Sequence, residues 1–95
     1  MAGTTAKGEV SERLLAMLRC PRTKKRLRRA DAELLARVNA SIRAGAVQDI
    51  AGTLVEKPMD GALITEDGKL LYAVIDRIPV LLPDEAIEVQ RVESA

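Results

Sequence analysis

The stretch ALITEDGKLLYAV, residues 62–74, decides the fold that this sequence predicts. Two apolar runs flank an Asp-Gly dipeptide, an arrangement typical of a tight turn between antiparallel β-strands. We therefore predict a β-hairpin with strands over residues 62–65 and 69–74. A further extended apolar segment, residues 78–82 (IPVLL), follows the hairpin. Because proline has no amide hydrogen, Pro79 confines this segment to the end or the edge of a sheet.

Two helices are predicted on the N-terminal side of this hairpin. Ser11 is a good N-cap and the leucines behind it recur at helical spacing, so we expect a short amphipathic helix over about residues 11–18. Asp31 is the N-cap of a second helix over about residues 31–45, whose apolar side chains form a single stripe. Gly45 is the natural end of that helix, because glycine readily adopts the left-handed conformation found there.

Short elements and two tails complete the prediction. Residues 24–29 are expected to form a short strand at a sheet edge, where charged side chains oppose unwanted edge pairing. Residues 53–56 are expected to form another short strand, and residues 84–86 to begin a last turn of helix. Residues 1–10 and 89–95 are expected to be flexible tails, the second of them acidic.

Length and composition favour one small domain with an α+β fold. The chain has 95 residues, of which 47% are hydrophobic and 31% charged, so it is neither disordered by composition nor a membrane span. We predict a single domain over residues 11–88, made of a small antiparallel β-sheet, a short N-terminal helix and a helical insertion at about 31–45. Its core must be aliphatic, because Tyr72 is the only aromatic residue.

The composition also disfavours most catalytic and metal-binding chemistry. The chain has no histidine, the commonest general acid–base residue and metal ligand in proteins. Cys20 is the only cysteine, so no internal disulfide, redox pair or all-cysteine metal site can form. We therefore expect no catalytic residues, no metal and no cofactor. The first residues contain no apolar signal segment, so the cytoplasm is the expected compartment.

Charge is distributed unevenly along the chain. Residues 1–47 carry 11 Lys or Arg against 4 Asp or Glu, whereas residues 48–95 carry 4 against 10. A run without acids is a candidate polyanion-binding site, with Arg19, Arg22, Lys24, Lys25, Arg26, Arg28 and Arg29 as its members. The alternative is a solvated basic turn that docks on an acidic protein surface or on nothing. With a single aromatic residue for base stacking, sequence-specific recognition of single-stranded RNA is disfavoured.

Two separated stretches carry a resemblance to a known family. The first is LLAMLRCPRTK, residues 14–24, followed by Leu27, and the second runs from DGALIT, residues 60–65, to YAVIDRIPVLLPDEA, residues 72–86. Together they resemble the small bacterial proteins of the YcaR type, which belong with the zinc-ribbon-like activator subunits of tRNA and protein methyltransferases. The resemblance implies a zinc-ribbon-like sheet, in which residues 31–44 are an insertion relative to the shortest members.

The resemblance also implies that a metal site has been lost. Relatives that bind zinc carry four cysteine ligands, whose positions fall here on Cys20, Thr23, Thr65 and Gly68. Only Cys20 could ligate, whereas a structural zinc site needs four nitrogen or sulfur ligands. The implied fold is therefore metal-free, with hydrogen-bonded threonines and with Cys20 as a small buried side chain or, alternatively, a reactive thiol. Relatives commonly have glycine where this chain has Arg77. If the position requires a positive φ, either Arg77 is strained or the turn differs.

The function that the resemblance implies is that of an accessory subunit. Such a subunit binds and stabilises an S-adenosylmethionine-dependent methyltransferase that acts on tRNA or translation proteins, and contributes no chemistry. We place the contact at a sheet edge that a partner strand extends, formed by Ile78, Pro79, Val80, Leu81 and Leu82. The alternative is that these residues fill the protein's own core. A second hypothesis is a nucleic-acid or ribosome-associated binding module that uses the basic segment 19–29; an enzyme is disfavoured, since no nucleophile–base pair or phosphate loop accompanies the acidic pairs.

Overall fold

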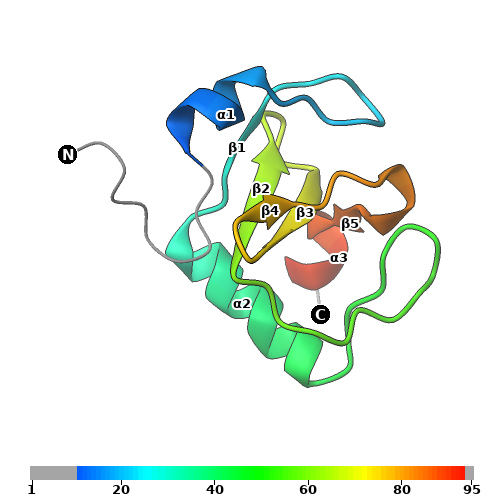
Figure 1. Ribbon diagram of the computed structural model, residues 1–95. Coiled ribbons are helices and arrows are strands. Elements are labelled where there is room, and N and C mark those ends of the chain that lie inside the picture. The colour runs from blue at the N-terminus through cyan, green and yellow to red at the C-terminus, as the bar shows by residue number, and fades with distance from the viewer. Residues whose placement is uncertain (1–10, 94–95) are drawn as a thin grey trace.

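The central hairpin is formed by β2 (Gly61–Thr65) and β3 (Leu70–Ile75), as the sequence predicts. The computed structural model of the protein describes residues 11–93 (Figure 1). In the register of the hairpin, Leu63 pairs with Tyr72 and Ile64 pairs with Leu71. Gly68 lies in the connecting turn with a φ of +76°, a conformation that glycine adopts without steric cost.

Every strand pairing among the described residues is antiparallel. The sheet runs in the order β1 (Leu27–Arg29), β2, β3 and β4 (Ile78–Pro79). β5 (Ile87–Glu88) also pairs with β3, on the same side as β4 and nearer the start of β3. The predicted strand over residues 24–29 is therefore shorter than expected but does lie at an edge. The α+β class with a small antiparallel sheet is confirmed.

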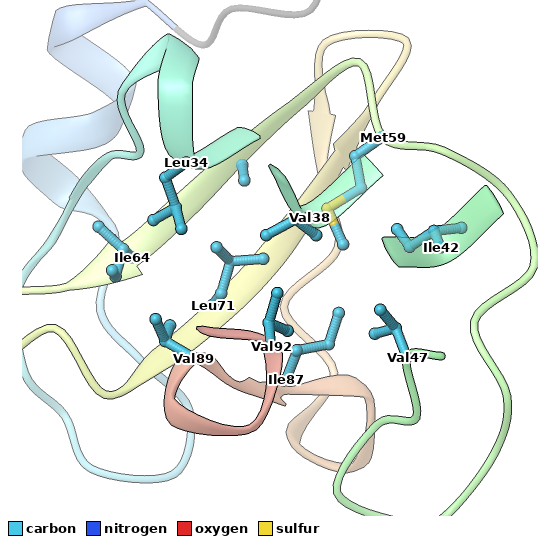
Figure 2. Close-up of a cluster of buried hydrophobic side chains, with 11 residues drawn as sticks. Leu34, Val38, Ile42, Val47, Met59, Ile64, Leu71, Ile87, Val89 and Val92 are labelled. Carbon is cyan, nitrogen blue, oxygen red and sulfur yellow. The ribbon is translucent and has the colours of Figure 1, made fainter. Parts of the chain in front are cut away.

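Neighbouring side chains of β3 enter two separate apolar clusters, because side chains alternate along a strand. Leu71 lies in a cluster with α2 (Ala32–Arg43) and α3 (Val89–Glu93), whereas Tyr72 lies in a cluster beside α1 (Glu12–Met17). Figure 2 shows the first cluster, in which α2 and the C-terminal segment face each other across the sheet residues. Its buried members are Leu34, Val38, Ile42, Val47, Met59, Ala62, Ile64, Leu71, Ile87, Val89 and Val92.

The first two helices begin where their capping residues predict. The Ser11 hydroxyl accepts a hydrogen bond from the Leu14 amide at 3.2 Å, and the Asp31 carboxylate accepts one from the Leu34 amide at 2.7 Å. Gly45 follows α2 with a φ of +75°, as expected for a helix C-terminus. Between residues 11 and 93, no helix has the length and apolar character needed to cross a bilayer.

Asn39 on α2 fixes the chain where it returns to the sheet. Its side-chain NH₂ donates to the Met59 carbonyl at 2.9 Å, and its side-chain oxygen accepts from the Met59 amide at 2.8 Å. One side chain thus satisfies both backbone groups of Met59. This pairing sets the position of β2, which begins two residues later.

Residues 53–56 do not form the predicted strand. The loop instead contains an isolated bridge between Gln48 and Leu54 and is organised around the buried carboxylate of Asp49. That carboxylate accepts hydrogen bonds from the amides of Ala51 and Thr53, at 3.0 and 2.9 Å. Side-chain bonds of this kind compete with strand pairing and favour a turn.

The predicted tail over residues 89–95 is wrong as far as residue 93. Residues 89–93 form α3, whose Val89 and Val92 are buried against the α2 cluster. The predicted turn at residues 84–86 is a 3₁₀ helix, η1 (Pro83–Glu85). The other predicted tail, residues 1–10, lies outside the described residues.

Candidate functional site

β4, at one edge of the sheet, begins the predicted partner-binding segment. A two-residue turn joins it to β3, and its members Asp76 and Arg77 have φ angles of 51° and 67°. Positive φ at both central residues is the geometry of a type I′ turn, which matches the twist of the flanking strands. Arg77 therefore adopts the left-handed conformation, at the position where the resemblance suggested that a positive φ is required. The Asp76 amide donates to a carboxylate oxygen of Asp60 at 2.7 Å, which holds the turn.

Two of the five predicted partner-binding residues lie on the surface. Ile78 is 65% exposed and Leu82 is 53% exposed. More than half of each side chain is therefore open to contact with another molecule. Because β4 ends the strand order, its side away from β3 has no neighbouring strand in the described part of the chain. An apolar, unpaired sheet edge is therefore available to another chain.

The next residues divide between the two faces of the sheet. The Val80 amide donates to the Ala73 carbonyl at 2.9 Å, and the Val80 side chain lines a groove beside loop 49–57. Leu81 is half-buried and packs against the cluster that contains Tyr72. Pro79 is also half-buried, and it pairs with Val74. Leu81 thus packs against the core while Ile78 and Leu82 lie on the surface, and contact of the segment with a partner stays a prediction.

The positions of the lost metal ligands are occupied by hydrogen-bonded groups. The Cys20 thiol is fully buried, and its Sγ lies 3.0 Å from the Tyr72 hydroxyl. The buried Thr65 hydroxyl donates to the Asp67 carboxylate at 2.6 Å and accepts from the Leu70 amide at 3.1 Å. The Thr23 hydroxyl accepts from the Lys25 amide at 3.3 Å.

Titration of these groups reflects the same contacts. Burial raises the pKa of the Cys20 thiol, but hydrogen bonds with Thr23, Tyr72 and the Arg22 backbone outweigh it, so this pKa lies below its ordinary value. Burial and the hydrogen bond with Cys20 raise the pKa of Tyr72. The hydrogen bond from Thr65, followed by one from the Lys69 amide, lowers the pKa of Asp67. Complete burial favours the reading of Cys20 as a packed side chain over that of a reactive thiol.

These residues do not fit zinc. Of the four ligand positions only Cys20 carries a sulfur or nitrogen donor, and a structural zinc site needs four. Among residues 11–93, no group of three or more His, Cys, Asp or Glu side chains could hold a metal ion. We therefore derive no role for a metal here.

The basic run forms an exposed loop that precedes and includes β1. A bridge between Arg19 and Arg26 closes the loop, and Lys24 within it has a φ of 66°. One member of the run is separated from the others, since Arg29 is half-buried and pairs with Glu12 at 2.5 Å. The remaining cations are exposed, and they are Arg19, Arg22, Lys24, Lys25, Arg26 and Arg28.

The sequence did not reveal the groove on the Val80 side of the sheet. Its walls come from loop 49–57, β3 and η1, which are separated along the chain and lie side by side in Figure 1. The one related signal in the sequence is the excess of Asp and Glu in residues 48–95. That excess does not show which of these acids lie on the same surface.

The fold places the chain in a class of small α+β proteins built on an antiparallel sheet. Residues 11–76 match the model of the Trm112p-like protein family. The solution NMR structure of XF2673 from Xylella fastidiosa is similar, with 36% identity, a TM-score of 0.70, and coverage of 84% of this chain and 82% of that one. No curated protein matches the chain. The chain belongs to the Trm112p-like family, whose members are small, non-catalytic activators or partners of methyltransferases.

Proposed function

We propose that this chain is a non-catalytic subunit that binds an S-adenosylmethionine-dependent methyltransferase acting on tRNA or on a protein of the translation machinery. The observation that carries the proposal is the unpaired edge at β4, flanked by the exposed side chains of Ile78 and Leu82. Family membership supplies the class of partner. With such a partner, the chain would act in the cytoplasm.

Strand addition is the binding mode that best suits this edge. A strand of the methyltransferase would lie along the free side of β4. Because Pro79 has no amide hydrogen, this side of β4 offers the Pro79 carbonyl as an acceptor and no main-chain donor from Pro79. Covering Ile78 and Leu82 would contribute on the order of 2–4 kcal/mol, since both are large aliphatic side chains that are now more than half exposed. The rigid type I′ turn between β3 and β4 presents the edge in one conformation, which reduces the entropy lost on binding.

The test is purification of the tagged chain from its native cells, followed by identification of proteins recovered in stoichiometric amount. We expect a methyltransferase that is still recovered in high salt, because the side chains exposed at the β4 edge are apolar and are not screened by salt. The enzyme should lose soluble yield or methyl-transfer activity when expressed without this chain. A methyltransferase that is equally soluble and active alone would contradict the proposal.

The exposed basic loop favours a second candidate, contact with the phosphate backbone of RNA. Five exposed cations, including Arg22 and Lys25, lie on the short loop closed by the Arg19–Arg26 bridge, and a sixth, Arg28, lies on β1. Binding to a single-stranded RNA would weaken with salt, with a log–log slope of roughly −0.7 for each phosphate contact. Recovery that is lost in high salt and abolished by ribonuclease would favour this candidate over the apolar edge.

A further inference from the structure

A groove with an apolar floor and an acidic rim runs beside the proposed edge. It has a volume of about 690 Å³. Its floor includes Leu54, Val55, Ile75 and Val80, which come from loop 49–57, β3 and the residue after β4. Carboxylates stand along the rim at Glu56, Asp84 and Glu85, all of them exposed.

The walls of the groove are held by hydrogen bonds within the protein. The Val55 amide donates to the Val47 carbonyl at 2.9 Å, which ties loop 49–57 to the residues that precede it. The Ile50 amide donates to the Ala86 carbonyl at 2.8 Å, which ties this loop to the segment after η1. Since both walls are anchored, the groove exists before any partner binds.

We infer that the groove binds an extended segment of the partner protein that carries aliphatic side chains together with Lys or Arg. This inference rests on the proposed function, because it names the chemistry of the segment through which the methyltransferase docks. Aliphatic side chains of such a segment would cover the floor at Leu54 and Val80. Its cations would pair with the three carboxylates of the rim. The groove lining contains one cation, Lys57, so the rim keeps an excess of negative charge.

Continuity with β4 is a second argument for this occupant. Val80 directly follows β4 and lines the groove, so a strand that pairs with β4 would continue into it. A second copy of this chain is a poorer occupant. Its cationic loop, residues 19–26, contains no Leu, Ile, Val or Met side chain to cover the apolar floor.

Fluorescence anisotropy with a labelled synthetic peptide tests the inference without the methyltransferase. The probe alternates valine with lysine or arginine, and two companion peptides replace either the cations by glutamate or the valines by serine. We expect the first peptide to bind and both companions to bind about tenfold more weakly or not at all, because floor and rim each contribute. Equal binding of the glutamate peptide would overturn the inference.

Two sets of isosteric substitutions locate the binding. Glu56→Gln, Asp84→Asn and Glu85→Gln together should weaken the probe about tenfold, since three exposed charge pairs are lost. The matched control, Glu12→Gln with Glu33→Gln and Glu66→Gln, removes three exposed carboxylates outside the groove. Circular dichroism melts verify that both variants are folded. Equal affinity of the two triple variants would overturn the inference, as would binding that follows self-association of the chain.

The same variants separate this inference from the proposed function. If the groove variant still recovers the methyltransferase as well as the control does, the groove is not its docking site, while the subunit role stands. If no methyltransferase is recovered even with the unaltered chain, the proposed function fails. The peptide measurement then still decides what the groove binds.

Discussion

The thiol of Cys20 lies 3.0 Å from the hydroxyl of Tyr72, and both side chains are fully buried. Cys20 lies within the basic loop and Tyr72 lies in the middle of β3. The only cysteine and the only aromatic residue of the chain thus join these two segments. The contact therefore links these two segments through side chains of the protein itself.

Tyr72 should ionise only when the protein unfolds. Burial, and then the hydrogen bond with Cys20, raise its pKa above the ordinary value of 10.0. A group whose pKa is raised by folding contributes stability below its unfolded pKa, and this stability is lost as the pH rises above about 10. Tyrosinate absorbance and circular dichroism should therefore change together in an alkaline titration. Tyr72 is the only tyrosine, so the tyrosinate absorbance reports on this residue alone. Tyrosinate absorbance that appears while the circular dichroism signal is still that of the folded protein would contradict this expectation.

The double hydrogen bond between Asn39 and Met59 should be a major local contribution to stability. Asn39→Ala leaves both backbone groups of Met59 without their partner, and we expect the free energy of unfolding to fall by about 1–3 kcal/mol. Urea denaturation measures the change. Glu33→Gln, on an exposed position of the same helix, is the control and should change little. Equal midpoints for the two variants would show that the pairing contributes nothing.

The turn at Gly68 should resist β-branched substitution for a conformational reason. Gly68 has a φ of +76°, and a Cβ added there would meet no atom within 4 Å. The cost of Gly68→Val is therefore backbone strain, which we expect to lower the free energy of unfolding by about 1–3 kcal/mol. Gly68→Asn should cost less, because asparagine tolerates the left-handed region. Equal denaturation midpoints for the valine and asparagine variants would contradict this account.

The purified protein should contain no zinc. Three of the four ligand positions carry Thr23, Thr65 and Gly68, which cannot replace thiolates. Elemental analysis should find no stoichiometric metal, and a chelator should leave the melting temperature unchanged. Nearly one equivalent of zinc, with unfolding on chelation, would show that other groups complete a site.

Local signals in the sequence were enough for the hairpin and for α2. An Asp-Gly turn between apolar runs and an Asp31 cap before an apolar stripe each act over a few residues, so they can be recognised without the fold. α3 lacks such a signal, since only its contact with α2 shows that Val89 and Val92 are core residues. The course of residues 53–56 depends on the buried carboxylate of Asp49, whose partners are set by the loop as a whole.

For residues 78–82, too, the sequence alone does not predict which side chains are buried. Alternation along the chain predicts that Val80 and Leu81 face opposite sides, but not which of them faces the core. The structure assigns Leu81 to the Tyr72 cluster and Val80 to the groove. We therefore expect Leu81→Asp to unfold the domain and Val80→Asp to leave it folded but unable to capture its partner. Circular dichroism melts check the first part, and two unfolded variants would show that the segment is wholly core.

Capture of the methyltransferase by a variant of the β4 edge shows whether the partner binds there. Ile78→Asp places a charge on the 65% exposed residue that begins β4, and Met17→Asp, at a 72% exposed position on α1, is the matched control. Both variants should melt like the unaltered chain. The account predicts that Met17→Asp recovers the methyltransferase in stoichiometric amount and that Ile78→Asp recovers none. Full recovery by folded Ile78→Asp would contradict the claim that the partner binds at this edge.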